Sequence, residues 1–120
     1  MRIRRGQAAF RKTLLSRYGA TCAFSGPCPA EALDAAHLYS YSKTGEHSVQ
    51  GGLFIRLDLH RLFDLGLLVV QPVTHRLDVQ ASLLNYPEYA KVAGQLPSIR
   101  LSGGQLRWLL LHWKQHRAGV

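Results

Sequence analysis

The sequence predicts a small α+β fold made of one domain, and three observations support this prediction. The chain has 120 residues, and two independent units would each have only about half of them. At that size a hydrophobic core alone is barely enough to stabilise a fold without disulfides or metal ions. Hydrophobic residues make up 47% and charged residues 18%, which excludes a disordered chain and a coiled coil. Helix-like and strand-like patterns alternate without a linker or an internal repeat. We therefore expect residues 1–120 to form a single domain.

The first part of the chain predicts a helix and then a bent hairpin. Residues 4–18 favour a helix because apolar side chains recur at helical spacing, and Gly19 ends it. Residues 20–24 and 33–38 are predicted to be extended, on either side of a Gly-Pro-Cys-Pro turn that no helix could cross. We expect these two segments to pair with each other. Residues 39–52 are polar, as is typical of an irregular surface loop that carries function.

The second part predicts a short helix and a second hairpin. Residues 57–65 favour a helix that Gly66 closes, with Asp58 well placed at its positive N-terminal end. Residues 67–71 and 76–79 are predicted to be strands that turn at the segment between them. The predicted order so far is helix, hairpin, loop, helix, hairpin.

The C-terminal part predicts further helices. A short helix is expected over 87–93, an extended piece over 98–101, and a final helix over 102–117 with Ser102 as its cap. The final helix is expected to bury a stripe of apolar side chains, namely Leu106, Leu109, Leu110 and Trp113. His112 and His116 share a face of this helix, and we assign them no role in a site.

The charge balance points to a polyanionic partner. Fifteen Lys and Arg stand against seven Asp and Glu, which makes the formal net charge +8. This charge favours contact with a nucleic-acid backbone through counterion release, while solubility or an acidic protein partner would explain it equally. The longest apolar runs, 65–70 and 108–111, fall well short of the roughly 20 residues that cross a bilayer, so we expect a cytoplasmic protein that makes no membrane contact. Cys22 and Cys28 are too few for a disulfide scaffold or a four-cysteine zinc site, and we interpret them as reduced thiols.

Three residues could form a hydrolytic site. On a helix, His60 and Asp64 lie four residues apart and project from one face, so an imidazole and a carboxylate there can hold one divalent cation. An ordinary ion pair within the helix would explain the same spacing. His37 ends a predicted strand just before the polar loop, and a histidine there can accept a proton from water near neutral pH. A structural role in hydrogen bonding is the alternative for His37.

These motifs resemble the HNH endonucleases, which have the ββα-metal fold. The resemblance covers most of the chain and is strongest in the DLHRLFD segment of residues 58–64 at its distance behind the AAH segment of residues 35–37. It implies a ββα-metal core over about residues 20–66, flanked by an N-terminal helix and by a C-terminal hairpin and helix. It also implies that His37 is the general base, that His60 is a metal ligand, and that Asp64 is a further ligand.

Two positions depart from the pattern of this family. The family often has a metal-binding Asp or His immediately before the base, where this chain has Ala36, and Asp34 is the nearest candidate substitute. The asparagine of the middle motif would fall on Gly51, and Gln50 or His47 are the candidates to compensate for it. These departures leave open a module that binds DNA but has impaired or lost cleavage.

The resemblance implies hydrolysis of phosphodiester bonds in DNA with one divalent metal ion. A ligand shell of histidine and carboxylate suits magnesium, manganese, nickel or zinc and does not choose among them. Candidate phosphate contacts are Arg61 and Arg56 beside the ligand helix and Arg5 and Arg11 in the N-terminal helix. A phage or restriction-type component, a toxin neutralised by an acidic inhibitor protein, and a homodimer all stay open.

Overall fold

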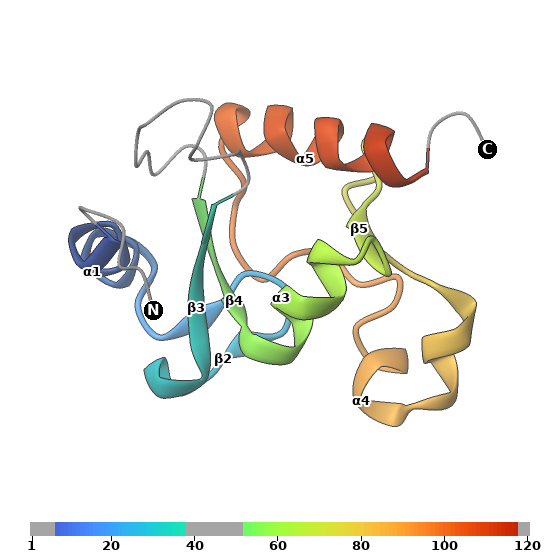
Figure 1. The fold of residues 1–120 in the computed structure, drawn as a ribbon, viewed down its shortest axis with the longest axis horizontal. Helices are drawn as coiled ribbons and strands as arrows, with labels where there is room; N and C mark the ends of the chain where they lie inside the picture. The colour runs from blue at the N-terminus through green and yellow to red at the C-terminus, as the bar shows by residue number, and fades with distance from the viewer. Residues whose placement is uncertain (1–6, 38–51, 118–120) are drawn as a thin grey trace.

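The structure, a computed structural model, describes residues 7–37 and 52–117, and its elements confirm the predicted α+β class (Figure 1). Three two-stranded antiparallel sheets, β1–β2, β3–β4 and β5–β6, alternate with helices in this part of the chain. In chain order the elements are α1 (Gln7–Tyr18), β1 (Thr21–Cys22), β2 (Gly26–Pro27), η1 (Ala30–Ala32), β3 (Leu33–His37), β4 (Gly52–Arg56), α3 (Leu57–Asp64), β5 (Leu68–Val70), β6 (Leu77–Val79), η3 (Ala81–Asn85), α4 (Pro87–Ala90) and α5 (Gly103–His116).

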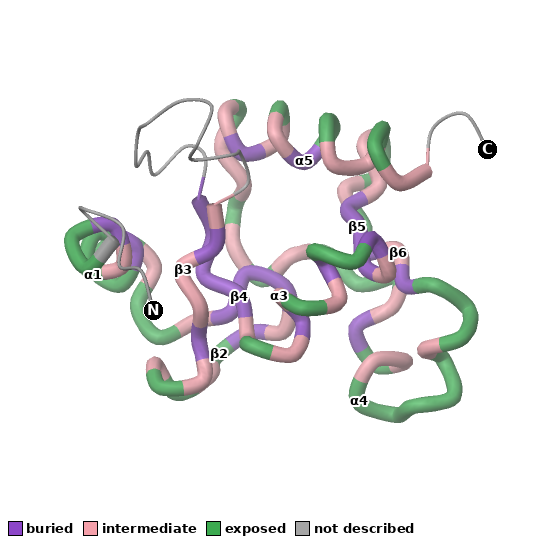
Figure 2. The backbone as a smooth tube through the Cα atoms, in the orientation of Figure 1, coloured by how far each residue is buried: buried purple, intermediate pink, exposed green. Residues whose placement is uncertain are grey.

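The β3–β4 hairpin lies between α1 and α3, which are on opposite sides of it (Figure 1). Its register pairs Leu33 with Arg56 at one end and His37 with Gly52 at the other. Residues 52–55 of β4 and the whole of β5 are buried, whereas only Leu33 and Ala36 of β3 are (Figure 2). Since α3 begins at the residue that follows β4, the hairpin and this helix form one ββα unit.

The predicted pairing of residues 20–24 with residues 33–38 is wrong. Residues 21–22 pair with 26–27 in a very short hairpin, and β3 pairs instead with β4. The strand over 52–56 was missed because its apolar run is short and continues without a break into a helix, so periodicity does not separate the two. Strand pairing between segments distant in sequence is also invisible to local patterns. The expected loop over 39–52, apart from its last residue, lies outside the described residues.

Helix α1 packs on the hairpin through its buried Phe10 and Leu14. The ring of Phe10 lies so close to Gly52 that a Cβ at this position would overlap it. Gly52 is therefore required by the close approach of α1 to β4. The N-terminal end of the predicted helix, residues 4–6, lies outside the described part of the chain.

Helix α5 confirms the predicted cap but buries a different face. The Ser102 hydroxyl accepts the Gln105 backbone N–H, and the Gln105 side chain accepts the Ser102 N–H, which completes a capping box. Gln105 is fully buried and donates to the Tyr18 hydroxyl and to the Gly52 carbonyl. Of the predicted apolar stripe only Leu109 is fully buried, whereas Leu110 is exposed. The helix is rotated because Gln105 finds two buried partners that the sequence does not reveal.

The remaining elements are close to the predictions. The second hairpin forms as β5–β6, and the short helix after Tyr86 ends at Ala90, earlier than expected. Residues 98–101 form no strand. No helix in the described ranges is both long and apolar enough to cross a bilayer.

Candidate active site

Strand β3 and helix α3 bring Asp34 and His60 into contact. Helix α3 buries Leu59 and Phe63, and His60, which lies beside this buried face, is directed towards β3. The His60 Nδ1 lies 2.9 Å from Asp34 Oδ2. Since an ionised carboxylate only accepts hydrogen bonds, Nδ1 carries the proton, and the lone pair of the neutral ring is on Nε2.

The other ring nitrogen of His60 faces Asp64. His60 Nε2 lies 3.4 Å from Asp64 Oδ2, which is longer than an ordinary hydrogen bond between nitrogen and oxygen. Two donors at this separation fit one divalent cation, since bonds from such a cation to nitrogen and oxygen are about 2.1 Å long. The Asp64 side chain is 63% exposed and the His60 side chain 24%, so solvent reaches the pair.

Asp34 contacts Nδ1 of His60, whereas Asp64 faces Nε2. Asp34 therefore does not join the His60–Asp64 pair as a third ligand. It accepts the Nδ1–H, which holds the imidazole in one orientation and makes Nε2 a better ligand. In the part of the chain that the structure describes, no group of three His, Cys, Asp or Glu side chains could hold a metal ion. The expectation of Asp34 as a direct ligand is therefore not met in this arrangement.

His37 is not brought to the His60–Asp64 pair. Its ring stacks on Phe10 of α1, with ring centroids 4.1 Å apart and an interplanar angle of 11°. Successive strand residues face opposite sides of a sheet, so His37 and Asp34, three apart, lie on different faces of β3. The expected gathering of all three residues around one gap is thus not seen, because the alternation of the strand separates them.

The four predicted phosphate contacts have different environments. Arg11 donates from Nη1 to the Leu33 carbonyl and from Nη2 to the Ala30 carbonyl, each over 2.6 Å. Arg56 forms a bidentate ion pair with Asp58, at 2.6 and 3.0 Å. Arg61 is exposed on α3, and no described residue pairs with it. Arg5 lies outside the described residues.

The N-terminal end of α3 is stabilised by a network that centres on Asp58. Besides Arg56, the Tyr89 hydroxyl donates to Asp58 Oδ2 over 2.9 Å and the Leu59 backbone N–H donates to Oδ1 over 3.0 Å. Burial raises the pKa of Asp58, but the hydrogen bonds from Arg56 and Tyr89 outweigh this effect and lower the pKa overall. Asp58 is therefore a structural carboxylate. Sequence analysis missed Tyr89, because nothing local connects it to a residue 31 positions earlier.

The remaining candidates have structural roles or lie outside the described ranges. Cys22 and Cys28 are free thiols, and the Cys22 Sγ accepts three backbone N–H groups, from Phe24, Ser25 and Arg56. Burial is the main cause that raises the pKa of Cys28. The positions considered for the middle motif, His47, Gln50 and Gly51, are not among the described residues.

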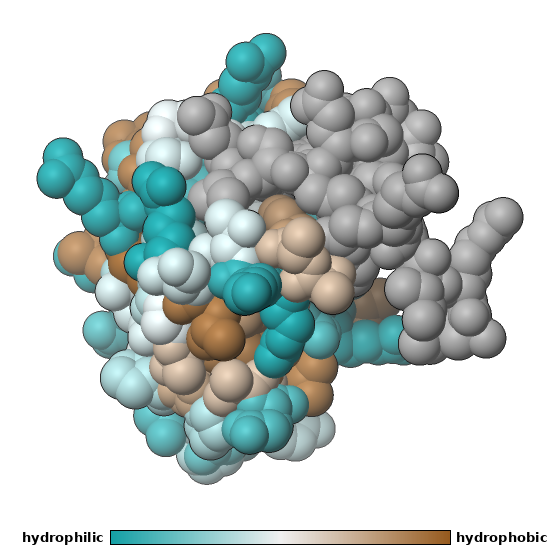
Figure 3. Space-filling model, turned by 90° about the vertical axis from the view of Figure 1, so that its left-hand side faces the viewer, coloured by the Kyte–Doolittle hydropathy of each residue, from teal (hydrophilic) through white to brown (hydrophobic). Residues whose placement is uncertain are grey.

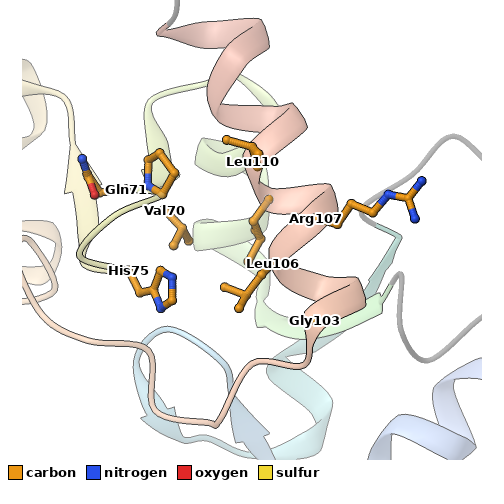
Figure 4. A pocket seen from close by; sticks show the side chains of 9 residues that line it. Val70, Gln71, His75, Gly103, Leu106, Arg107 and Leu110 are labelled. Carbon is orange, nitrogen blue, oxygen red and sulfur yellow. The ribbon is translucent and has the colours of Figure 1, made fainter.

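Two surface features lie apart from the His60–Asp64 pair. A pocket of about 290 Å³ lies between β5, the turn after it and α5, and its lining is mainly apolar; the Arg107 side chain points away from it (Figure 4). None of the predicted site residues lines this pocket. On the α1 side of the molecule, hydrophilic and hydrophobic side chains are interspersed over the described surface (Figure 3).

The comparison with family models identifies the segment that contains these residues. Residues 22–71 match the model described as HNH endonuclease. The matched segment contains β3, β4 and α3, and therefore Asp34, His37, His60 and Asp64. No curated protein matches this chain.

Proposed function

Through residues 22–71 this chain belongs to the HNH endonuclease family, and we propose that it is a metal-dependent endonuclease that hydrolyses phosphodiester bonds in DNA. One observation carries the proposal. His60 donates its Nδ1–H to Asp34 and leaves Nε2 facing the exposed Asp64 carboxylate at 3.4 Å. We also propose that residues 1–120 act as one domain, since α1 and α5 both pack on the matched segment, and that the protein acts in the cytoplasm.

His60 and Asp64 are the residues that would hold the metal ion. Magnesium, manganese, nickel and zinc are all compatible with an imidazole and a carboxylate. When bound, the ion would act as a Lewis acid that stabilises negative charge on the scissile phosphate and on the leaving oxygen. Asp34 accepts the Nδ1–H and so keeps the His60 imidazole oriented with Nε2 towards the metal position.

His37 is the proposed general base. It lies at the end of β3, a strand that has a free edge in the two-stranded β3–β4 sheet of the described structure. Because successive side chains of a strand point to opposite faces, a phosphodiester that runs along this free edge would meet side chains from both faces of β3. In this arrangement His37 takes a proton from the attacking water on one side, and Asp34 and His60 act on the other.

Arg61 is the proposed contact with a neighbouring phosphate. It follows His60 on α3, is exposed, and has no ion-pair partner in the described residues. A guanidinium group can bind a phosphate through two parallel hydrogen bonds. The net charge of +8 strengthens attraction of the DNA backbone.

A plasmid cleavage assay tests the proposal. The purified chain is incubated with supercoiled DNA in EDTA or in Mg²⁺, Mn²⁺, Ni²⁺ or Zn²⁺. We expect cleavage that requires a cation and falls about 100-fold or more in His60→Ala and in His37→Ala. His75→Asn, at a turn residue with a φ of 62°, is the control and should cleave normally. Cation-independent cleavage, or full activity in His60→Ala, would reject the proposal.

A DNA-binding module with impaired cleavage is the second candidate. The observation that favours it is the stacking of His37 on Phe10, on the face away from His60. The same assay separates the two functions. A gel shift of intact plasmid in every cation, unchanged in His37→Ala, would support binding alone.

A further inference from the structure

Helix α5, which lies outside the matched residues 22–71, contacts the C-terminal end of α3. His112 Nε2 lies 2.7 Å from the Phe63 carbonyl oxygen, and because a carbonyl only accepts, the imidazole donates this hydrogen bond. The His112 ring also stacks on the Phe63 ring, with centroids 3.7 Å apart and planes 7° from parallel. Phe63 is the residue immediately before Asp64.

Two more side chains of this C-terminal segment hold the glycine that follows α3. Gly66 has a φ of 77°, and a Cβ there would overlap the His116 ring. Arg117 donates from Nη1 to the Gly66 carbonyl over 2.8 Å. The last turn of α3 and its closing glycine are therefore held by His112, His116 and Arg117.

Asp64 needs such support from outside its own helix. Its side chain is 63% exposed, and His60 is its only ion-pair partner among the described residues. Its position depends on the backbone of the last turn of an eight-residue helix, where carbonyl groups lack partners within the helix. The Phe63 carbonyl in this turn accepts the Gly66 N–H over 3.0 Å, and His112 supplies its second hydrogen bond.

We propose that His112 is a positioning residue for the metal site: by holding the carbonyl and ring of Phe63, it fixes the last turn of α3 so that Asp64 faces His60. This inference rests on the proposed function, since it assumes that His60 and Asp64 bind a metal ion. His112 is not itself a ligand of this site, because its Nε2–H is donated to Phe63 and its other nitrogen, Nδ1, is buried away from solvent.

Two substitutions separate the hydrogen bond from the stacking. His112→Gln keeps an N–H donor at about the position of Nε2, and His112→Phe keeps a stacked ring without a donor. Binding of Mn²⁺ to the full chain is measured by titration calorimetry, and thermal unfolding without metal is measured in parallel. We expect His112→Phe to weaken Mn²⁺ binding about 10-fold, as for other supports of metal ligands, and His112→Gln to stay within about threefold of wild type.

A double-mutant cycle shows whether the effect passes through Asp64. In an Asp64→Ala background, His112→Phe should cause no further loss of Mn²⁺ affinity. An equal loss of Mn²⁺ affinity in the wild-type and Asp64→Ala backgrounds would overturn the inference. So would a loss of affinity in His112→Phe and His112→Gln that only follows the fall in their melting temperatures. If His112→Phe does not fold, His112→Met, which also removes the donor, is titrated in its place; unchanged Mn²⁺ affinity in it would overturn the inference.

The failure of this inference is distinguishable from the failure of the proposed function. If the wild-type chain binds no Mn²⁺, or binds it no better than His60→Ala does, the metal site is absent and both proposals fail. If binding requires His60 but is unchanged in His112→Phe, the inference about His112 alone fails.

Discussion

The two faces of the β3–β4 hairpin use their polar side chains differently. On the α1 face, the Arg11 guanidinium is engaged by two backbone carbonyls and His37 stacks on Phe10. On the α3 face, His60 is oriented by Asp34, and its second nitrogen faces an exposed carboxylate at 3.4 Å without a hydrogen bond. The comparison teaches that similar residue types serve packing where their polar atoms are satisfied, and are available for a ligand where they are not.

The largest effect on stability is expected on the α1 face, for Gly52→Ala. The new Cβ would overlap the Phe10 ring, so α1 must move away from β4. We expect the free energy of unfolding to fall by about 2–3 kcal/mol, as for an overpacked core, when it is measured by urea denaturation. Gly103→Ala is the matched control because no atom lies near a Cβ there. Equal stability of both variants would show that α1 does not pack as described.

On the α3 face, Asp34→Asn is expected to act on metal binding more than on stability. Asparagine can still accept the Nδ1–H of His60 but lacks the negative charge that makes the ring a better ligand. We expect Mn²⁺ affinity to fall about 10-fold in calorimetry. Glu88→Gln, in an exposed pair with Lys91, is the control and should bind as wild type does. An unchanged affinity in Asp34→Asn would remove Asp34 from the site.

We also expect different roles for Arg11, on the α1 face, and Arg61, on helix α3. Arg11→Ala should cost about 1 kcal/mol of stability, because two hydrogen bonds to carbonyls are lost. Arg61→Ala should leave stability unchanged but weaken DNA binding and reduce the slope of log affinity against log salt by about one. Fluorescence anisotropy over a salt series and chemical denaturation measure the two effects. If Arg11→Ala weakened DNA binding alone and left stability unchanged, the contrast drawn between the two faces would be wrong.

The last prediction concerns the α3 side, where we expect a loss of stability in mild acid. Burial lowers the pKa of His112 to about 4, although the Phe63 carbonyl and Asp64 raise it and His116 and Arg117 lower it. The unfolded chain takes up the proton near the usual histidine value of about 6.5, so stability is complete above that pH and is lost as the pH falls towards 4. Melting temperatures at pH 7, 5.5 and 4.5 should fall more steeply for wild type than for His112→Gln. Parallel curves would show that His112 titrates normally.

Much of the fold and part of the site follow from the sequence alone. The spacing of four between His60 and Asp64 places both on one helix face whatever the rest of the chain does, because helical geometry is local. The Ser102 cap and the β5–β6 hairpin are likewise specified by neighbouring residues, and the structure confirms both. The family resemblance, carried by short motifs, is confirmed over residues 22–71.

Only the tertiary structure decided which elements meet. The pairing of β3 with β4, the contact of Asp34 with His60 Nδ1, and the separation of His37 from His60 depend on strand partners and on which face of β3 each side chain takes. The rotation of α5 that brings His112 to Phe63 depends on buried partners of Gln105 far away in sequence. Local patterns specify which side chains share a face of an element, but the packing of the whole chain determines what that face touches.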